Sequence, residues 1–223
     1  MDIHYIPTKF ITKEYKNFDK LIDMLPKNIG LVATTQYIDI AKEIKKILEN
    51  KGFVVYTKKS DFYPEMIILG CEGSAADVNA DTVLLIGSGK FHALEIARKF
   101  NKKVIVYDPI SGNISVIKDD TFQKKISILL YEIKNSKKIG IITSIKPGQY
   151  YLKKILKIKE ELKKKDKEVF LFLTDNIIFD ELQNFPDIDF WIIAACPRLI
   201  DDIFERKIRA ITIDILEKYI REI

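Results

Sequence analysis

The sequence predicts an α/β fold built from two successive parallel-sheet units of similar build. Short continuous apolar runs, closed by glycine or a polar turn, alternate with stretches whose apolar residues have helical spacing. Such runs are typical of strands buried on both faces of a parallel sheet, with the helices as crossovers. The alternation begins again after residue 137. The 223 residues suffice for one large domain or two small ones, and the restart favours two.

In the first half, the apolar runs predict strands at residues 3–6, 30–34, 53–57, 82–86 and 103–107, and a further run ends at Gly70-Cys71. Helices are expected over residues 13–25 and 37–50 and after the glycine-rich turn that follows residue 86. Thr34, Thr35 and Gln36 supply polar side chains of the kind that cap helices, which supports a helix beginning at residue 37.

In the second half, the predicted order is helix 119–136, strand 138–144, helix 150–165, strand 168–174, a short helix to 185, strand 189–196, strand 210–213 and a terminal helix. We therefore expect residues 1–117 to form a first α/β domain and residues 118–223 a second.

The composition is that of a folded protein, with 47% hydrophobic and 31% charged residues. The formal net charge of +5 comes mostly from lysines on expected helix faces, which indicates a solvated surface rather than direct nucleic-acid binding. A weak attraction to an acidic or RNA-associated partner stays open. The N-terminal residues lack the pattern of a signal peptide, and the apolar runs are too short to span a membrane. With two cysteines and no CxxC pair, we expect a cytoplasmic protein with reduced thiols.

The two cysteines stand at comparable places, because Cys71 and Cys196 each end a buried run in one of the two units. Sites in parallel sheets form at the carboxyl ends of the strands, and thiolates there suit a soft metal or an iron–sulfur cluster. Buried core cysteines are the alternative. Two thiols are too few for a whole cluster, and neither histidine, His4 or His92, completes a set.

Two strand-end loops are candidate ligand-binding segments. Gly87-Ser88-Gly89-Lys90 could face an anion with its amides at a helix N-terminus, although it matches neither the P-loop nor the dinucleotide motif. Lys146-Pro147-Gly148-Gln149 could hold a ligand with its polar tip. For the first loop we favour a tight strand-to-helix turn, and for the second a turn is an equally good explanation.

Four phrases of the sequence resemble a known family. They are LGCEGSAADVNADTVLLIGSGKFH at 69–92, VYDPISG at 106–112, KPGQY at 146–150 and NFPDIDFWIIAACPRLIDD at 184–202. In this order they are similar to the archaeal 2-(3-amino-3-carboxypropyl)histidine synthase of diphthamide biosynthesis. The stretch at 185–198 is the most specific part.

The resemblance implies three similar α/β domains around a 4Fe–4S cluster, with one cysteine from each domain. It implies a transferase in which S-adenosylmethionine, bound at the cluster, is cleaved in a reductive radical reaction. The 3-amino-3-carboxypropyl group then passes to a histidine of translation elongation factor 2. By position, Cys71 and Cys196 resemble the ligands of the middle and last domains, and Gly87, Gly89, Lys146, Gly148 and Gln149 are candidate cofactor-binding residues.

The sequence departs from the family in one respect, because the first domain and its cysteine have no counterpart in it. A related chain could complete the site in a homo- or hetero-oligomer. The chain could instead be a non-catalytic subunit or scaffold without a complete cluster, or have taken on another task with vestigial cysteines. An unrelated α/β protein whose glycine loops hold an anion is a further alternative. From the similarity of the two units, we also expect the sulfurs of Cys71 and Cys196 to face one cleft within reach of a cluster.

Overall fold

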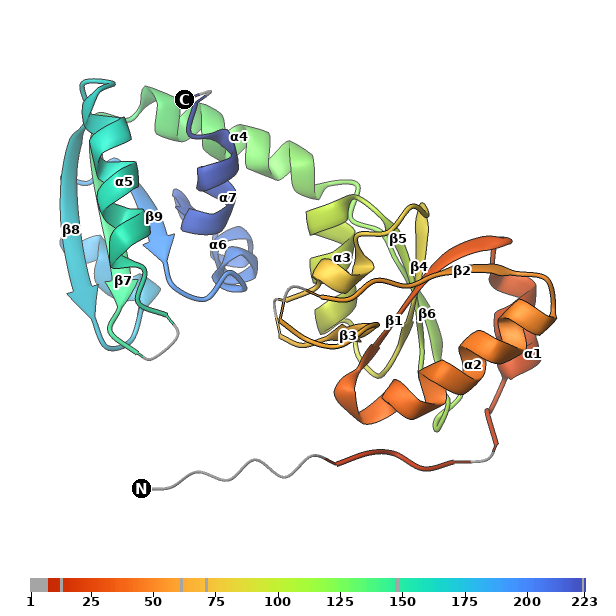
Figure 1. Cartoon of the computed structure of the whole chain (residues 1–223). Helices are drawn as coiled ribbons and strands as arrows, with labels where there is room; N and C mark the ends of the chain where they lie inside the picture. The colour runs from red at the N-terminus through yellow and green to blue at the C-terminus, as the bar shows by residue number, and fades with distance from the viewer. Residues whose placement is uncertain (1–7, 13, 61, 71, 147–148, 222) are drawn as a thin grey trace. The chain divides into compact units, whose positions relative to one another are not determined.

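The computed structural model describes residues 8–223 except positions 13, 61, 71, 147, 148 and 222. The chain divides into two compact units, Met1–Asp120 (unit 1) and Thr121–Ile223 (unit 2), which we describe separately (Figure 1). This division falls just beyond the boundary placed after residue 117. The reason is that Asp119 forms an ion pair with Arg98 of unit 1, at 2.8 Å between carboxylate and guanidinium.

Unit 1 is built on a sheet with strand order β2-β1-β4-β5-β6, and the short strand β3 pairs with the end of β1. The strands are β1 (Asn28–Thr34), β2 (Val54–Tyr56), β3 (Ile67–Ile68), β4 (Thr82–Ile86), β5 (Lys103–Tyr107) and β6 (Ile114–Ile117). The pairs are parallel except β5 with β6, which is antiparallel. The sequence did not predict β6, because this half-exposed strand lacks the continuous apolar run of a buried one.

The helices of unit 1 cover both faces of this sheet. They are α1 (Phe18–Met24), α2 (Ile38–Asn50), α3 (Phe91–Phe100) and the 3-10 helices η1 (Thr35–Tyr37) and η2 (Ser74–Ala76). Successive strand residues point to opposite faces. Leu84 and Ile86 therefore pack with α1 and α2, whereas Val83 and Leu85 pack with α3 and η2. Burial on both faces explains why β4 reads as an uninterrupted apolar run.

The first predicted helix, over residues 13–25, was wrong at its start, since α1 begins at Phe18. Asn17 takes a left-handed conformation with φ of 58°. The segment before it is bound elsewhere, because Lys16 N–H donates to Pro109 O at 3.1 Å and the Tyr107 hydroxyl donates to Lys16 O at 2.8 Å. The strand predicted at residues 3–6 lies outside the described residues.

Unit 2 is a parallel sheet with strand order β10-β9-β7-β8 and one hydrophobic core. The strands are β7 (Lys138–Ser144), β8 (Glu168–Thr174), β9 (Phe190–Ala194) and β10 (Ala210–Thr212). The helices are α4 (Phe122–Asn135), α5 (Leu152–Lys163), η3 (Phe179–Asn184), α6 (Leu199–Arg206) and α7 (Ile213–Tyr219). The strand predicted at 189–196 ends at Ala194, so Cys196 lies in the turn after it. Across the described part of the chain, no helix combines the length and apolarity needed to cross a lipid bilayer.

The two units share one topology. The order β2-β1-β4-β5 in unit 1 matches β8-β7-β9-β10 in unit 2, strand for strand in chain order. This repeat confirms the predicted α/β class with two units of similar build. In each unit the connections leave the central strand in opposite directions, and we call the carboxyl ends of β1 and β4, and of β7 and β9, the crevice of that unit. Open α/β sheets bind ligands at such crevices.

Candidate functional site

In unit 2, the structure places Cys196 at the crevice between the carboxyl ends of β7 and β9. Its thiol is unbridged and half-buried, in the turn that leads from β9 into α6. The turn is ordered, since Leu199 N–H donates to Cys196 O at 3.1 Å. A half-buried thiol at an open strand end is suited to bind a metal or to react.

The predicted binding loop lies on the β7 side of the same crevice. Lys146 is exposed, and its ammonium donates to the side-chain oxygen of Asn176. Gln149 is half-buried and its N–H donates to Lys146 O at 3.0 Å. The hydroxyl of Thr143 lies 2.7 Å from Ala194 O and 3.4 Å from Gln149 O, so it touches both sides of the crevice. The structure therefore brings Gln149 close to the strand end that leads to Cys196, while Gly148 lies outside the described residues.

In unit 1, the Gly87–Lys90 turn follows β4 at the equivalent crevice. Gly87 is buried against Thr34 of β1, and its N–H donates to Tyr107 O at 3.0 Å. That amide is thus already bonded within the sheet and is not available to an anion. Gly89 has a φ of +77°, a conformation that side chains rarely adopt, which accounts for glycine there. These features fit a strand-to-helix turn, with exposed Ser88 and Lys90 at its tip.

A polar cluster around Tyr37 and Asp108 lies at the same edge, and of these two residues only Asp108 stands out in the sequence, at the end of an apolar run. The Tyr37 hydroxyl donates to Asp108 at 3.4 Å. Burial raises the pKa of Tyr37, the Asp108 charge adds to this, and a hydrogen bond with Ser88 opposes it. The Asp108 carboxylate also accepts from Ile110 N–H at 3.0 Å and from the Ser111 hydroxyl at 2.7 Å. The only signals in the sequence were the polar residues at the ends of two apolar runs.

Cys71 itself lies outside the described residues, but the backbone on either side of it is ordered. It follows β3, which pairs with β1 through Thr34 and Ile68. Leu69 and Glu72 exchange two backbone hydrogen bonds of 3.1 and 3.0 Å, and Gly70 has a φ of +61°.

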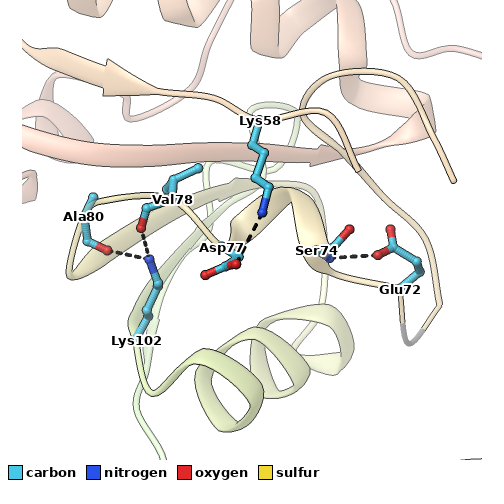
Figure 2. A network of polar contacts seen from close by, with 7 residues as sticks. All are labelled: Lys58, Glu72, Ser74, Asp77, Val78, Ala80 and Lys102. Carbon is cyan, nitrogen blue, oxygen red and sulfur yellow. Dashed lines mark hydrogen bonds and ion pairs between the residues drawn. The ribbon is translucent and has the colours of Figure 1, made fainter. Parts of the chain in front are cut away.

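Figure 2 shows the polar contacts that hold the segment after Cys71 in place. The Glu72 carboxylate accepts from Ser74 N–H at 2.9 Å. Burial raises the pKa of Glu72, but hydrogen bonds from Ser74 and Ser60 outweigh it and leave the pKa below its usual value. Further along, Lys58 pairs with Asp77 at 3.3 Å, and the Lys102 ammonium donates to Val78 O and, at 2.8 Å, to Ala80 O.

The cysteines do not occupy equivalent strands, contrary to what their similar surroundings in the sequence suggested. Cys196 follows β9, whose counterpart in unit 1 is β4, with the glycine turn at its end. Cys71 follows β3, which pairs with the end of β1 on the other side, as the end of β8 pairs with the end of β7 in unit 2. Both cysteines still follow strands at the carboxyl edge of a sheet.

The Cys196 thiol fits a single thiolate ligand of an iron–sulfur cluster. Within the part of the chain that the structure describes, no group of three or more His, Cys, Asp or Glu side chains could hold a metal ion. An iron–sulfur cluster is usually held by three or four protein ligands, so Cys196 alone would not hold one.

Comparison with known proteins settles the family. A family model described as "Putative diphthamide synthesis protein" matches residues 1–206. The chain belongs to this family. The resemblance noted in the sequence is thereby confirmed.

Within the diphthamide synthesis family, two archaeal relatives carry the name 2-(3-amino-3-carboxypropyl)histidine synthase. The Pyrococcus horikoshii protein is 35% identical over 185 residues, which cover 81% of this chain and 54% of that protein. The Methanocaldococcus jannaschii protein is 33% identical over 197 residues, covering 86% and 51%. The chain thus spans about half the length of these relatives.

A solved structure resembles the whole described fold. The crystal structure of Dph2 from Pyrococcus horikoshii with a 4Fe–4S cluster has a TM-score of 0.76 and 31% sequence identity, and the match covers 92% of this chain and 60% of that one. The Schizosaccharomyces pombe relative, 29% identical over 80% of this chain and 44% of its own, is named subunit 1 of the synthase.

Proposed function

We propose that this chain takes part in the first step of diphthamide biosynthesis. In that step the 3-amino-3-carboxypropyl group of S-adenosylmethionine is transferred to a histidine of translation elongation factor 2. The observation that carries the proposal is the Cys196 thiol at the crevice of unit 2, in a chain whose fold is similar to a Dph2 crystallised with a 4Fe–4S cluster.

In this proposal Cys71 and Cys196 would hold a 4Fe–4S cluster as thiolates, and a related chain would supply a further ligand in a homo- or hetero-oligomer. When bound, such a cluster supplies the electron for reductive, radical cleavage of the bond between sulfur and the γ-carbon. The half-buried position of Cys196 limits water at the thiolate while leaving one side open to the crevice.

The loop beside Cys196 would bind the polar end of S-adenosylmethionine. The Lys146 ammonium bonds the neutral amide of Asn176, so its positive charge remains for the substrate's carboxylate. Gln149 would add amide hydrogen bonds, together with Gly148. We assign Gly87 and Gly89 a shaping role at the unit 1 crevice, since the Gly87 amide is already bonded.

A second candidate function is that of a non-catalytic subunit without a complete cluster of its own. One observation favours keeping it: the Schizosaccharomyces pombe relative is named as a subunit of the synthase. Either role places the protein in the cytoplasm with elongation factor 2, where thiols stay reduced.

The test is an anaerobic transfer assay with S-adenosylmethionine labelled in the aminocarboxypropyl group, elongation factor 2 and a chemical reductant. The chain is assayed alone and with a full-length synthase, each as wild type and as Cys196→Ala. We expect labelling above that of the synthase alone, and we expect Cys196→Ala to abolish this gain. A gain that survives Cys196→Ala would support the subunit role. If labelling never exceeds that of the synthase alone, both roles are wrong.

A further inference from the structure

The last two residues of β7, Thr143 and Ser144, carry buried hydroxyls at the crevice of unit 2. Their exposed fractions are 3% and 2%. Neighbouring residues of a strand point to opposite faces of the sheet, so the two hydroxyls have different surroundings. A buried hydroxyl without a partner would cost free energy, and both have partners.

Thr143 reaches toward β9. Its hydroxyl donates to Ala194 O at 2.7 Å, and the carbonyls of Gln149 and Ser144 lie further away at 3.4 and 3.5 Å. A hydroxyl has a single hydrogen, so the short contact to Ala194 is the main bond. Ala194 is the last residue of β9 and stands two positions before Cys196.

Ser144 reaches toward β8 and the loop. Its hydroxyl donates to Asp175 O at 2.9 Å and accepts from Lys146 N–H at 3.1 Å. Asp175 directly follows β8, and Lys146 begins the predicted binding segment. One residue therefore fixes both the neighbouring strand end and the start of the loop.

We propose that the Thr143 and Ser144 hydroxyls form a clasp that positions Cys196 relative to Lys146 and Gln149. The two are positioning residues, because they act on the backbone that carries the site residues. At the end of β8, by comparison, the Thr174 hydroxyl bonds within its own turn, to Asn176 O at 2.8 Å. Thr143 instead bonds a carbonyl 51 residues away, and Ser144 one 31 residues away. The effect of the clasp on a bound cluster rests on the proposed function, because it assumes that Cys196 is a cluster ligand.

The experiment compares Thr143→Val, which keeps the branched shape but removes the hydroxyl, with Thr143→Ser, which restores it. Thr174→Val is the matched control at the end of β8. All are made in a Cys71→Ala background, so that Cys196 is the remaining thiol of the two in the sequence. The readouts are the alkylation rate of Cys196 and amide hydrogen exchange in peptides over residues 194–199.

We expect Thr143→Val to raise both rates about tenfold, because it leaves a buried carbonyl unsatisfied and favours local opening of the turn. Thr143→Ser should stay within about twofold of the parent, and Thr174→Val should leave residues 194–199 unchanged. Unchanged rates in Thr143→Val would overturn the proposal, as would failure of Thr143→Ser to restore them. An equal rise in the peptides of α5 would show a general loss of stability and also overturn it.

A final readout connects the clasp to the cluster. Thr143→Val alone, with both cysteines present, should change the electron paramagnetic resonance spectrum of anaerobically reconstituted protein, and Thr143→Ser should restore the parent spectrum. If the parent takes up no cluster, either alone or with a related synthase chain, the cluster-binding role fails for this chain. Alkylation and exchange still test the clasp in that case, so the two failures are distinguishable.

Discussion

Asp189 joins the beginnings of two strands in unit 2, at the opposite end of the sheet from Cys196. Its carboxylate accepts from Lys137 N–H at 2.9 Å and from Lys138 N–H at 2.7 Å, just before and at the start of β7. Its own N–H donates to Lys138 O at 2.9 Å. Asp189→Asn keeps the size of the side chain but removes the charge that strengthens these bonds.

The expected loss of stability follows from the number of bonds. A hydrogen bond to a charged acceptor contributes about 1.5–3 kcal/mol, whereas a neutral one contributes about 1 kcal/mol. The asparagine oxygen can still accept a hydrogen bond from one or both N–H groups, but each bond is weaker because the acceptor is neutral. Asp189→Asn should therefore lower the free energy of unfolding by about 2 kcal/mol. For a domain of this size that corresponds to a melting temperature about 10 °C lower.

The effect has a defined pH dependence. Hydrogen bonds from Lys138 and Lys137 hold the pKa of Asp189 below its ordinary value, so the folded state binds the proton less well than the unfolded chain. Its contribution is therefore fully present above the unfolded pKa, about 3.9, and is lost as the pH falls through the lower folded value. The difference between wild type and Asp189→Asn should shrink below about pH 4.

The assay is urea unfolding followed by the fluorescence of Trp191. This is the single tryptophan of the sequence, 5% exposed and part of β9, so it reports on unit 2. Asp187→Asn, at an exposed position two residues earlier, is the control. A loss at pH 7 below about 0.5 kcal/mol, which surface substitutions commonly give, would refute the reasoning. So would a difference of the same size at pH 3 and pH 7.

Two further predictions concern packing and the N-terminal segment. A Cβ on Gly140 would lie 2.6 Å from the Trp191 ring, so Gly140→Ala should destabilise unit 2 by about 1–3 kcal/mol in the same unfolding assay. Gly73→Ala, whose Cβ would meet its nearest atom at 3.7 Å, should cost less than half as much by thermal melting of unit 1. Tyr107→Phe removes the bond to Lys16 O and should speed hydrogen exchange at residues 15–18 several-fold. Burial raises the pKa of Tyr107 to about 12, so the wild-type bond should persist at pH 10, and exchange that is equal in both proteins would contradict its role.

Much of the fold could be predicted because most strands are buried on both faces. The expected ranges 82–86, 103–107, 138–144 and 168–174 coincide with β4, β5, β7 and β8. The ranges 82–86, 103–107 and 168–174 each hold a continuous apolar run, and glycine or polar residues follow it. β6 was not predicted because it is half-exposed and so lacks a continuous apolar run, and its position is set by pairing with β5.

The site could be predicted only in part. Glycine and cysteine at strand ends indicated the carboxyl edge, and Cys196 and Gln149 do lie at one crevice of unit 2. Contacts between distant residues left no local pattern, as for Tyr37 with Asp108, which stand 71 positions apart. The unlike strand positions of the two cysteines also depend on strand order, which is set by long-range pairing.

The central claim is that Cys71 and Cys196 bind iron. The most direct measurement is anaerobic reconstitution with iron and sulfide, followed by iron counting and an absorption spectrum. The wild type, Cys71→Ala and Cys196→Ala are compared, each alone and with a related synthase chain. We predict iron–sulfur absorption and stoichiometric iron in the wild type, alone or in the mixture, and a loss in each alanine variant. Equal iron in all three proteins, or none in the wild type under either condition, would contradict the claim.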